Sequence, residues 1–266
     1  MTDKKQRLDV LLHQKNFFES RNQANAAVIA GQVRVNGKRA DKPGMKYDPD
    51  IQIEVMELPP YVSRGGYKLE KALRVFRISL AGKVVLDVGS STGGFTDCAL
   101  QHGAARVYAV DVGYGQLAWK MRTDPRVVAI ERTNIKNLEP EDLGTRPNFV
   151  TIDVSFISLE KVMPRVALLV DRQAGGVALI KPQFEAGREK VGKKGVVRDP
   201  AVHLEVLNRI NTMMEENGWG VLGIDFSPIR GPEGNIEYLM YFDLSGPREF
   251  DRDLIRRAVE AAHITL

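Results

Sequence analysis

Residues 84–97, with the sequence VVLDVGSSTGGFTD, combine an apolar run, a glycine-rich turn and the start of a helical pattern. The run at 84–88 predicts a buried strand, and Gly89 allows this strand to end in a sharp turn. Gly93 and Gly94 carry no Cβ atom, so a ligand can approach the backbone at the N-terminus of the following helix. The same glycines can instead serve packing alone. A strand, a tight turn and a helix in this order indicate an α/β architecture.

The spacing within the turn narrows the kind of ligand. Its pattern is G-x-x-x-G-G, which differs from the G-x-G-x-x-G of dinucleotide sites. Phe95 stands where a P-loop requires the lysine that binds phosphate. A turn without this lysine suits a nucleoside with a charged amino-acid tail, and the predicted cofactor is S-adenosylmethionine. The residues of this region that are predicted to bind it are Asp87, Gly89, Ser90, Ser91, Gly93, Gly94, Phe95 and Thr96.

Short apolar runs alternate with helical patterns through the rest of the chain. The predicted strands are 84–88, 107–110, 127–130, 149–152, 177–180, 221–224 and 236–242. Fully apolar strands separated by helices favour a mostly parallel sheet that is covered on both faces. The stretch 227–235 is too irregular for a crossover helix, so the last two strands are predicted to form an antiparallel pair at the sheet edge. Seven strands with this ending match the Rossmann-like methyltransferase fold.

Ligands of such sheets bind beyond the carboxyl ends of the strands, so polar residues at these ends are candidates. Asp111 follows the second strand, 22 residues after Gly89, where a carboxylate can accept hydrogen bonds from both ribose hydroxyls of the cofactor. Asp111 can also be a turn or helix cap. Val112 is predicted to bind the cofactor beside it. Asn134, after the third strand, either borders the adenine or only shapes a loop.

The first 58 residues have a different pattern. Two short helices, a hairpin at Asn36-Gly37 and a later strand at 51–55 are predicted in this order. Ser20 is expected to cap the second helix, and Gly31 is expected to end it in the left-handed conformation. The segment is therefore predicted to be a small α+β module.

Charge and proline content separate this module from the remainder. Residues 1–46 carry ten Lys and Arg against four Asp and Glu, a net charge of +6, while the rest of the chain sums to −2. A basic module beside a nearly neutral core is typical of a nucleic-acid reader attached to an enzyme, although a merely solvated surface has the same composition. The two prolines of Leu58-Pro59-Pro60-Tyr61 favour extended backbone. We predict a module over 1–58, a linker over 59–62 and a core domain over 63–266.

The N-terminal module resembles the S4 RNA-binding domain. The matching residues are Arg7-Leu8-Asp9, Ser20-Arg21, Ala24 and the run AGQVRVNG at 30–37. The resemblance implies binding of structured RNA through its shape and phosphate charge. Phe17 and Phe18 are expected in the core rather than as base-stacking platforms. The residues predicted to bind RNA are Lys4, Arg7, Arg21, Arg34, Lys38 and Arg39, together with Arg64 at the start of the core domain.

Four charged residues of the core form a second pattern. Asp153 and Lys181 end the fourth and fifth strands, Glu237 opens the last strand, and Lys68 precedes the first. Taken singly, each can be a surface charge. In this order they resemble the Lys-Asp-Lys-Glu tetrad of FtsJ-like RNA 2′-O-ribose methyltransferases. An S4 domain fused to such a core is the arrangement of the TlyA family, whose members are described as ribosomal RNA methyltransferases and as hemolysins. Further matching runs are VSRGGYKLEKAL at 62–73, DVSFISL at 153–159 and IKPQFEAG at 180–187.

The resemblance implies an S-adenosylmethionine-dependent enzyme that methylates ribose 2′-hydroxyls, with ribosomal RNA or ribosomal subunits as its partner. The implied catalytic residues are Lys68, Asp153, Lys181 and Glu237. A ribose hydroxyl must lose its proton to become a good nucleophile. Lys181 is the predicted base, Asp153 is expected to orient it, and Glu237 is expected to hold Lys68.

Three other functions are compatible with parts of the pattern. An RNA base methyltransferase shares the cofactor turn, but the prolines that often follow the acidic residue in enzymes acting on exocyclic amines are absent after Asp153. A membrane-active hemolysin needs an amphipathic or spanning segment, and no apolar run here approaches roughly 18 residues. A non-enzymatic RNA chaperone has no need of the four charged residues.

The remaining composition bears on localisation and metal content. The single cysteine, Cys98, fits a reducing compartment and is predicted to be a buried apolar residue. The N-terminus lacks the apolar segment of a secretory signal, so a cytoplasmic protein without membrane contact is expected. The four histidines show no metal-ligand spacing, and no metal is predicted.

Overall fold

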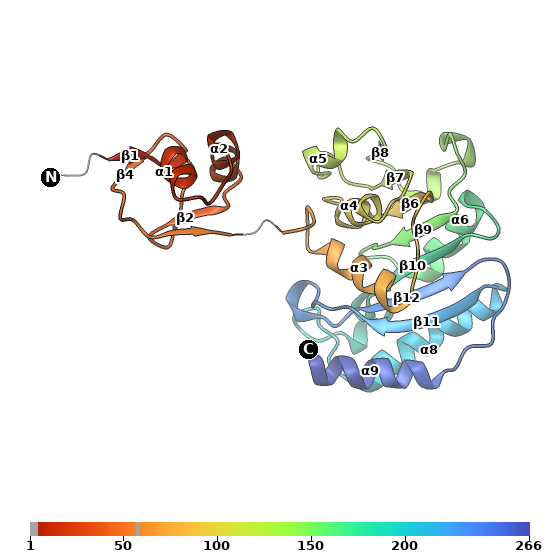
Figure 1. Ribbon diagram of the computed structural model, residues 1–266. Helices are drawn as coiled ribbons and strands as arrows, with labels where there is room; N and C mark the ends of the chain where they lie inside the picture. The colour runs from red at the N-terminus through yellow and green to blue at the C-terminus, as the bar shows by residue number, and fades with distance from the viewer. Residues whose placement is uncertain (1–4, 57–58) are drawn as a thin grey trace. The chain divides into compact units, whose positions relative to one another are not determined.

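The computed structural model describes residues 5–56 and 59–266, and the predicted RNA-binding residue Lys4 lies outside them. The chain divides into two compact units, residues 1–60 and 61–266, which we call the N-terminal and C-terminal units (Figure 1). Hydrophobic residues of the N-terminal unit form one core cluster, and those of the C-terminal unit form two.

The N-terminal unit combines two helices with short strands. Its elements are β1 (Gln6–Arg7), α1 (Leu8–Gln14), α2 (Arg21–Ile29), β2 (Val33–Val35), β3 (Lys38–Arg39), β4 (Lys46–Tyr47) and β5 (Ile53–Val55). Strand β2 pairs antiparallel with both β3 and β5. Ser20 caps α2 by accepting from the backbone N–H of Gln23 at 3.2 Å, and Gly31 follows the helix at φ +78°. Asn36 and Gly37 have positive φ angles of 49° and 74°, which form the predicted hairpin turn.

One expectation about this unit is wrong. Phe18 packs against the core of the unit, but the side chain of Phe17 is exposed. Helix α1 ends at Gln14, and the chain then turns through Asn16, whose φ is +58°. Both phenylalanines follow this turn outside the helix, and only Phe18 packs against the core.

The C-terminal unit alternates strands and helices. Its strands are β6 (Val84–Val88), β7 (Arg106–Val110), β8 (Val127–Ile130), β9 (Phe149–Ile152), β10 (Gly175–Ile180), β11 (Gly220–Phe226) and β12 (Tyr238–Asp243). Its α-helices are α3 (Gly65–Val75), α4 (Gly94–Gln101), α5 (Trp119–Arg122), α6 (Leu159–Leu169), α7 (Pro182–Glu185), α8 (Pro200–Glu216) and α9 (Asp253–Thr265). Short 3₁₀ helices are η1 (Ile135–Asn137), η2 (Pro140–Asp142), η3 (Arg188–Lys190) and η4 (Pro232–Gly234).

The seven strands form one sheet in the order β11-β12-β10-β9-β6-β7-β8. Strands β10, β9, β6, β7 and β8 are parallel to their neighbours in this series, whereas β12 is antiparallel to both β10 and β11. The predicted antiparallel pair at the sheet edge is therefore confirmed, and so is the predicted α/β class with seven strands.

Helices cover both faces of this sheet (Figure 1). Leu86 and Val88 of β6 pack in one cluster with residues of α6, α8 and α9. Val85, which precedes them in the same strand, packs in a second cluster with residues of α3 and α4. Alternate side chains of one strand thus enter opposite layers, as the strand geometry requires, and the strand is mostly apolar for this reason. The predicted burial of Cys98 on α4 is also confirmed.

The strand order reverses next to β6. From β6 the chain continues to β7 and β8 on one side, and then returns to place β9 on the other side of β6. Connections that leave in opposite directions open a crevice at the carboxyl ends of the two central strands, where ligands of doubly wound sheets bind. The glycine-rich turn follows β6 and Asp153 follows β9, so both lie at this point.

Candidate active site

A cavity of about 520 Å³ lies at the carboxyl ends of β6 and β9. The turn after β6 forms one wall, and the N-terminal part of α3 with Arg64 and Lys68 forms another. Asp153 and the segment 229–231 complete the lining. The cavity therefore brings together a predicted cofactor turn, two of the four predicted catalytic residues and the predicted RNA-binding residue Arg64.

The glycines of the turn are required by the protein itself. A Cβ atom on Gly89 would lie 2.5 Å from the carbonyl oxygen of Asp153, and one on Gly94 would lie 2.3 Å from Ser63 Oγ. The missing Cβ of Gly93 faces Leu117 Cδ1 at 2.8 Å. At Gly93 and Gly94 the Cβ positions are filled by neighbouring protein segments, so these glycines serve packing, and the approach of a ligand to their backbone stays a prediction. Gly89 and Gly94 still line the cavity.

Asp87 and Thr96 lie beneath the turn rather than in the cavity. Both are 0% exposed, and Thr96 Oγ1 donates to Asp87 Oδ2 at 2.6 Å. The other oxygen of Asp87 accepts from Thr151 Oγ1 of β9 at 2.8 Å, and burial raises the pKa of this carboxyl to about 6. The prediction that these two side chains contact the cofactor is contradicted by their burial. They instead join β6, α4 and β9 under the turn.

Asp111 is placed as the sequence predicts, at the end of β7 beside the turn. Its Oδ2 atom accepts from the backbone N–H of Ser91, and its Oδ1 atom accepts from that of Gly113, each at 2.7 Å. The carboxylate thus fixes the turn, and each oxygen retains lone pairs for a ligand hydroxyl. The neighbouring Val112 is 70% exposed. Asn134 accepts from the N–H of Lys136 and caps η1, which gives it a loop role, and its contact with the adenine stays a prediction.

Strand register assembles the four predicted catalytic residues. In the β10–β12 pair Ile180 lies opposite Tyr238, so Lys181 and Glu237 emerge next to each other. Strand β12 is antiparallel, and its start therefore lies at the edge where the parallel strands end. Asp153 follows β9, which pairs with β10. Lys68 reaches this edge from α3, whose helix packs on the sheet through Leu69, Ala72 and Leu73.

The contacts among these residues form one chain of alternating charge. Lys181 Nζ lies 2.6 Å from Asp153 Oδ1, and Lys68 Nζ lies 3.9 Å from Asp153 Oδ2. Lys68 Nζ also donates to Glu237 Oε2 at 2.6 Å. Lys181 Nζ further donates to Ser155 Oγ at 3.0 Å, a contact that sequence reasoning missed. Asp153 is thus shared between two lysines.

Glu237 is the most deeply placed member of the group. Its side chain is 0% exposed, and Oε1 lacks a hydrogen-bond partner in the described part of the chain. A Cβ on Gly231 would lie 2.2 Å from this oxygen, so a glycine at 231 provides the space for the carboxylate. A buried carboxylate against one ammonium group fixes Lys68 at a single position. The buried Glu237 carboxylate is thus the nearest charged partner of the Lys68 ammonium group.

Phe156 is a second feature that the sequence did not reveal. Its side chain is 90% exposed, and its φ of +63° lies in the left-handed region, which is strained for an aromatic residue. Its ring lies 4.8 Å from that of Phe184, and Lys181 Nζ lies 5.9 Å from the Phe184 ring. An exposed aromatic residue in a strained conformation, three positions after Asp153, is typical of a functional site rather than of packing. The sequence run DVSF at 153–156 includes Phe156, but it gave no sign that the side chain is exposed.

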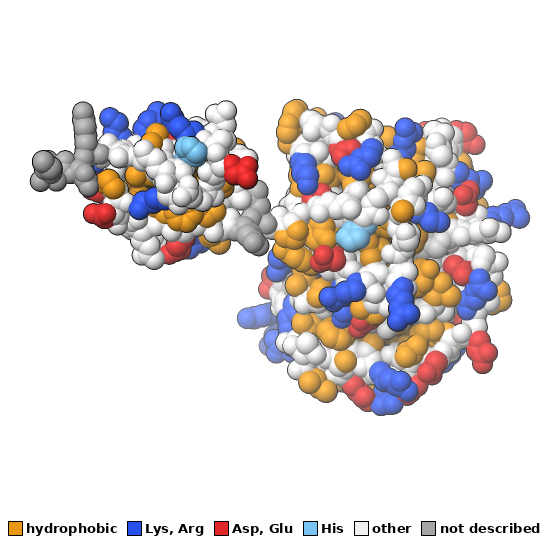
Figure 2. All heavy atoms as spheres, in the orientation of Figure 1, with side chains coloured by type: hydrophobic (Ala, Val, Ile, Leu, Met, Phe, Trp, Pro, Cys, Tyr) orange, Lys and Arg blue, Asp and Glu red, His pale blue; other side chains and the backbone are white. Residues whose placement is uncertain are grey.

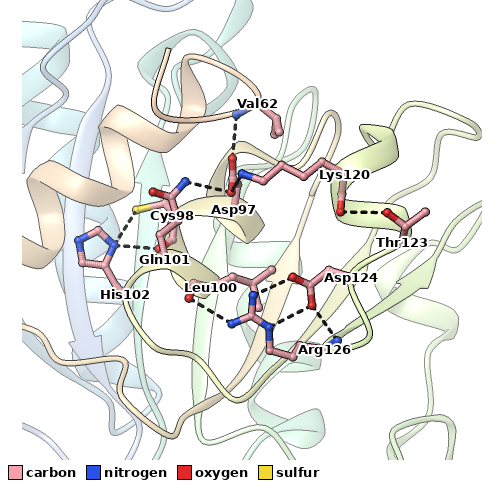
Figure 3. A network of polar contacts seen from close by, with 10 residues as sticks. All are labelled: Val62, Asp97, Cys98, Leu100, Gln101, His102, Lys120, Thr123, Asp124 and Arg126. Atoms are coloured by element: carbon pink, nitrogen blue, oxygen red, sulfur yellow. Dashed lines mark hydrogen bonds and ion pairs between the residues drawn. The ribbon is translucent and has the colours of Figure 1, made fainter. Parts of the chain in front are cut away.

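A buried carboxylate connects the segment before α3 to helix α4 (Figure 3). Asp97 lies in the first turn of α4 and is 1% exposed. It accepts from the backbone N–H of Val62 at 2.9 Å, from Lys120 Nζ at 2.9 Å and from Gln101 Nε2 at 3.0 Å. The segment that carries Ser63 and Arg64 is therefore fixed to the helix that begins at the glycine-rich turn.

The predicted RNA-binding residues of the N-terminal unit fall into two groups. Arg34 and Arg39 are exposed and lie directly opposite each other on β2 and β3, next to Lys38. Like charges in this arrangement destabilise a sheet, so an anionic partner is the expected compensation. Arg7 and Arg21 instead hold the buried Asp9 at 2.9 and 3.2 Å, and the hydrogen bond from Arg7 lowers the pKa of that carboxyl. Figure 2 shows several Lys and Arg side chains of this unit near α1.

Comparisons with known proteins agree with both units. A family model described as FtsJ-like methyltransferase matches residues 61–244, and one described as S4 domain matches residues 6–53. The chain is 52% identical over 272 residues to "Putative rRNA methyltransferase YqxC" of Bacillus subtilis, covering 100% of this chain and 97% of that protein. It is 42% identical over 258 residues to "16S/23S rRNA (cytidine-2'-O)-methyltransferase TlyA" of Mycobacterium tuberculosis, covering 96% of each.

The fold is also similar to the solved structure of a protein described as "Putative hemolysin from Streptococcus thermophilus". The TM-score is 0.77 and the sequence identity is 46%, and the match covers 99% of this chain and 97% of that chain. None of the helices in the described ranges 5–56 and 59–266 has the length and apolar character needed to cross a bilayer.

Proposed function

The chain belongs to the FtsJ-like methyltransferase family, with an S4 domain ahead of the catalytic domain, and we propose that it methylates ribose 2′-hydroxyls of ribosomal RNA with S-adenosylmethionine. One observation carries the proposal. Lys68, Asp153, Lys181 and Glu237 are in contact at the edge of the sheet where the glycine-rich turn ends β6. The pattern of two amines and two carboxylates is that of the family's RNA 2′-O-methyltransferases.

Residues in and beside the cavity suit S-adenosylmethionine. Helix α4 begins at Gly94 without a side-chain cap from the described residues, so its first N–H groups can bind the carboxylate of an amino-acid tail. Asp111 offers acceptor oxygens for ribose hydroxyls, and Val112 offers an exposed apolar surface for the adenine. When bound, the cofactor supplies an electrophilic methyl group on a sulfonium.

Within this proposal, Lys181 acts as the base. Lys181 would act in its neutral form: Nζ would take the proton of the 2′-hydroxyl as that oxygen accepts the methyl group that the bound cofactor would supply, and the lysine would end protonated beside Asp153. Asp153 and Ser155 hold Nζ from two sides, at 2.6 and 3.0 Å, and so determine its position. Lys68 shares the charge of Asp153 and is held in turn by Glu237. Orientation of this kind is what converts a weak nucleophile into a reactive one.

We further propose that the S4 domain binds structured RNA of a ribosomal subunit, with Arg34, Lys38 and Arg39 on phosphates. These residues lie on one hairpin, and their side chains form no ion pair with any residue in 5–56 or 59–266. Phosphate contacts position a protein on RNA without reading its sequence, so the hairpin would determine register and the catalytic unit would select the nucleotide. A ribosomal substrate implies a cytoplasmic reaction.

The test is transfer of a tritiated methyl group from S-adenosylmethionine to intact ribosomes and to separated subunits, followed by mass spectrometry of the labelled nucleoside. A methyl group on the ribose supports the proposal, and a methyl group on the base establishes the competing base methyltransferase. Release of haemoglobin from erythrocytes by the purified protein, with no transfer to RNA, would establish the membrane-active alternative.

A further inference from the structure

Two large aromatic side chains outside the catalytic group are largely exposed. Trp119 is 77% exposed and Tyr114 is 66% exposed, and both lie between β7 and β8. Single exposed apolar residues are ordinary on protein surfaces. Two exposed aromatic residues on one short segment, beside the glycine-rich turn, indicate a function for this surface. We call Tyr114, Trp119 and Arg132 the aromatic rim.

The aromatic rim is built from three segments that hydrogen bonds join together. The Arg132 guanidinium lies 3.8 Å from the centre of the Tyr114 ring, and the N–H of Arg132 donates to the Gly113 carbonyl at 2.9 Å. Glu131 accepts from the N–H of Gly115 at 2.9 Å and from Arg122 Nη2 at 2.8 Å. The loop after β7, helix α5 and the segment after β8 therefore form one surface.

Trp119 is exposed although its backbone is firmly held. Thr123 Oγ1 donates to the Trp119 carbonyl at 2.9 Å, and the next residue, Lys120, reaches inward to the buried Asp97 at 2.9 Å (Figure 3). The fold thus anchors α5 through Lys120 and presents Trp119 to solvent. A tryptophan side chain has only two rotatable bonds, so it loses little conformational entropy when a flat partner stacks on it.

The charge around the rim favours a nucleic acid. Arg132 has no acidic partner among the residues that the structure describes, whereas Asp124 and Glu131 are each paired with an arginine. Figure 2 shows hydrophobic side chains beside Lys and Arg side chains over α5. Aromatic rings interleaved with unpaired cations are the arrangement that binds single-stranded RNA, with bases on the rings and phosphates on the cations.

The rim is continuous with the cofactor turn. The N–H of Ala118 donates to the Thr92 carbonyl at 3.1 Å, and Ser91 Oγ lies 3.4 Å from Gln116 Oε1. We propose that the aromatic rim stacks unpaired nucleobases of the RNA strand that carries the target nucleotide. This proposal rests on the proposed function, because it assumes that RNA reaches the catalytic cavity. The aromatic rim would supply a base-stacking surface. The described residues of the N-terminal unit include only one exposed phenylalanine, Phe17, that could do so.

Tryptophan fluorescence provides the direct test, since the chain has two tryptophans, Trp119 and Trp219. The full-length protein is titrated with a single-stranded RNA of about 12 nucleotides and with a blunt duplex of the same length, while anisotropy of labelled RNA records binding. Stacking predicts quenching by the single strand that disappears in Trp119→Phe and persists in Trp219→Phe. Saturating single-stranded RNA without any quenching that depends on Trp119 would overturn the proposal.

Steady-state kinetics with ribosomal subunits provide the second test. Trp119→Ala is expected to raise KM for RNA about tenfold, the size of effect of losing one stacked base, whereas Trp119→Phe retains most of the affinity. The affinity for S-adenosylmethionine stays unchanged, and Leu168→Ala, an exposed apolar residue on α6, serves as the control. An unchanged KM in Trp119→Ala overturns the proposal.

Two outcomes distinguish this inference from the proposed function and from membrane binding. If RNA quenches Trp119 but the methyl group is found on a base, the proposed function fails and the aromatic rim stands. If phosphatidylglycerol vesicles shift Trp119 emission to the blue while single-stranded RNA has no effect, the rim binds membranes and the inference is overturned.

Discussion

The Nζ atom of Lys181 lies 2.6 Å from the Oδ1 atom of Asp153, across the carboxyl ends of the adjacent parallel strands β10 and β9. Each residue directly follows the last residue of a buried strand, and this places both side chains at the same edge of the sheet. The register of the two strands therefore determines the distance between the predicted base and the carboxylate that orients it.

Replacing the predicted base tests the catalytic assignment. Lys181→Met is expected to lower kcat for methyl transfer to RNA by about 10³-fold, the range of a lost general base. The affinity for S-adenosylmethionine, measured by calorimetry, is expected to stay within about twofold, because the side chain serves the chemical step. Lys161→Ala, an exposed lysine on α6, is the matched control. Normal transfer by Lys181→Met would remove Lys181 from the mechanism.

The buried pair of Lys68 and Glu237 is expected to contribute to stability as well as to activity. Glu237→Leu leaves the Lys68 ammonium without its nearest carboxylate, and breaking one partner of a buried pair costs about 3–5 kcal/mol of the free energy of unfolding. Urea unfolding measures this loss. The double variant Lys68→Met/Glu237→Leu is expected to recover much of it, since no buried charge is then left alone. Equal losses in the single and double variants would contradict the pairing.

Phe156 is expected to act on the RNA and not on the cofactor. Phe156→Ala should lower kcat/KM for RNA by about 10- to 100-fold, the effect of one lost stacking contact, with unchanged cofactor affinity. Phe156→Tyr should restore most of the activity because it retains the ring. Phe156→Gly relieves the positive φ and so should not lower the melting temperature. Full activity of Phe156→Ala would show that the exposed ring has no part in the reaction.

Asp111 is expected to act on cofactor affinity. Asp111→Asn removes the charge that accepts hydroxyl hydrogen bonds, and the affinity for S-adenosylmethionine should fall about tenfold or more. Calorimetry measures the change, and Glu141→Gln, an exposed carboxylate on η2, is the control. An undiminished affinity would limit Asp111 to fixing the turn through Ser91 and Gly113.

His203 makes the C-terminal unit sensitive to acid. Its Nε2 atom donates to the Val197 carbonyl at 3.1 Å, so Nδ1 accepts from the Tyr238 hydroxyl at 2.7 Å, and burial lowers the pKa of His203 from 6.5 to about 4. Between pH 6.5 and about 4, His203 takes up a proton in the unfolded chain but not in the folded chain. Stability present above about pH 6.5 is therefore lost on acidification, by roughly 3 kcal/mol near pH 4.

Urea unfolding between pH 7 and pH 4 measures this effect. His203→Gln should flatten the dependence on pH, although it also lowers stability at neutral pH. The exposed His13 provides the control, and His13→Gln should leave the dependence unchanged. An equally steep loss in His203→Gln would assign the acid sensitivity to other groups.

The order of strands and helices was predictable from the sequence, because each element depends on a local pattern. The apolar runs at 84–88 and 149–152 are strands since both faces of the sheet are covered, and alternation of β and α elements then favours a parallel sheet. The antiparallel end followed from the absence of a helical pattern at 227–235. The four charged residues at the sheet edge were found through their resemblance to a family pattern, not through any local signal.

What each side chain touches was not predictable in this way, because it depends on tertiary packing. Asp87 and Asp111 both lie at or near strand ends, yet one is sealed beneath the turn and the other borders it. Lys68 and Glu237 are 169 positions apart, and their contact depends on how α3 packs against the sheet. The exposure of Phe156 and Trp119 depends on which neighbours cover them. Burial and contact arise from packing of distant segments, and for that reason local sequence patterns do not contain them.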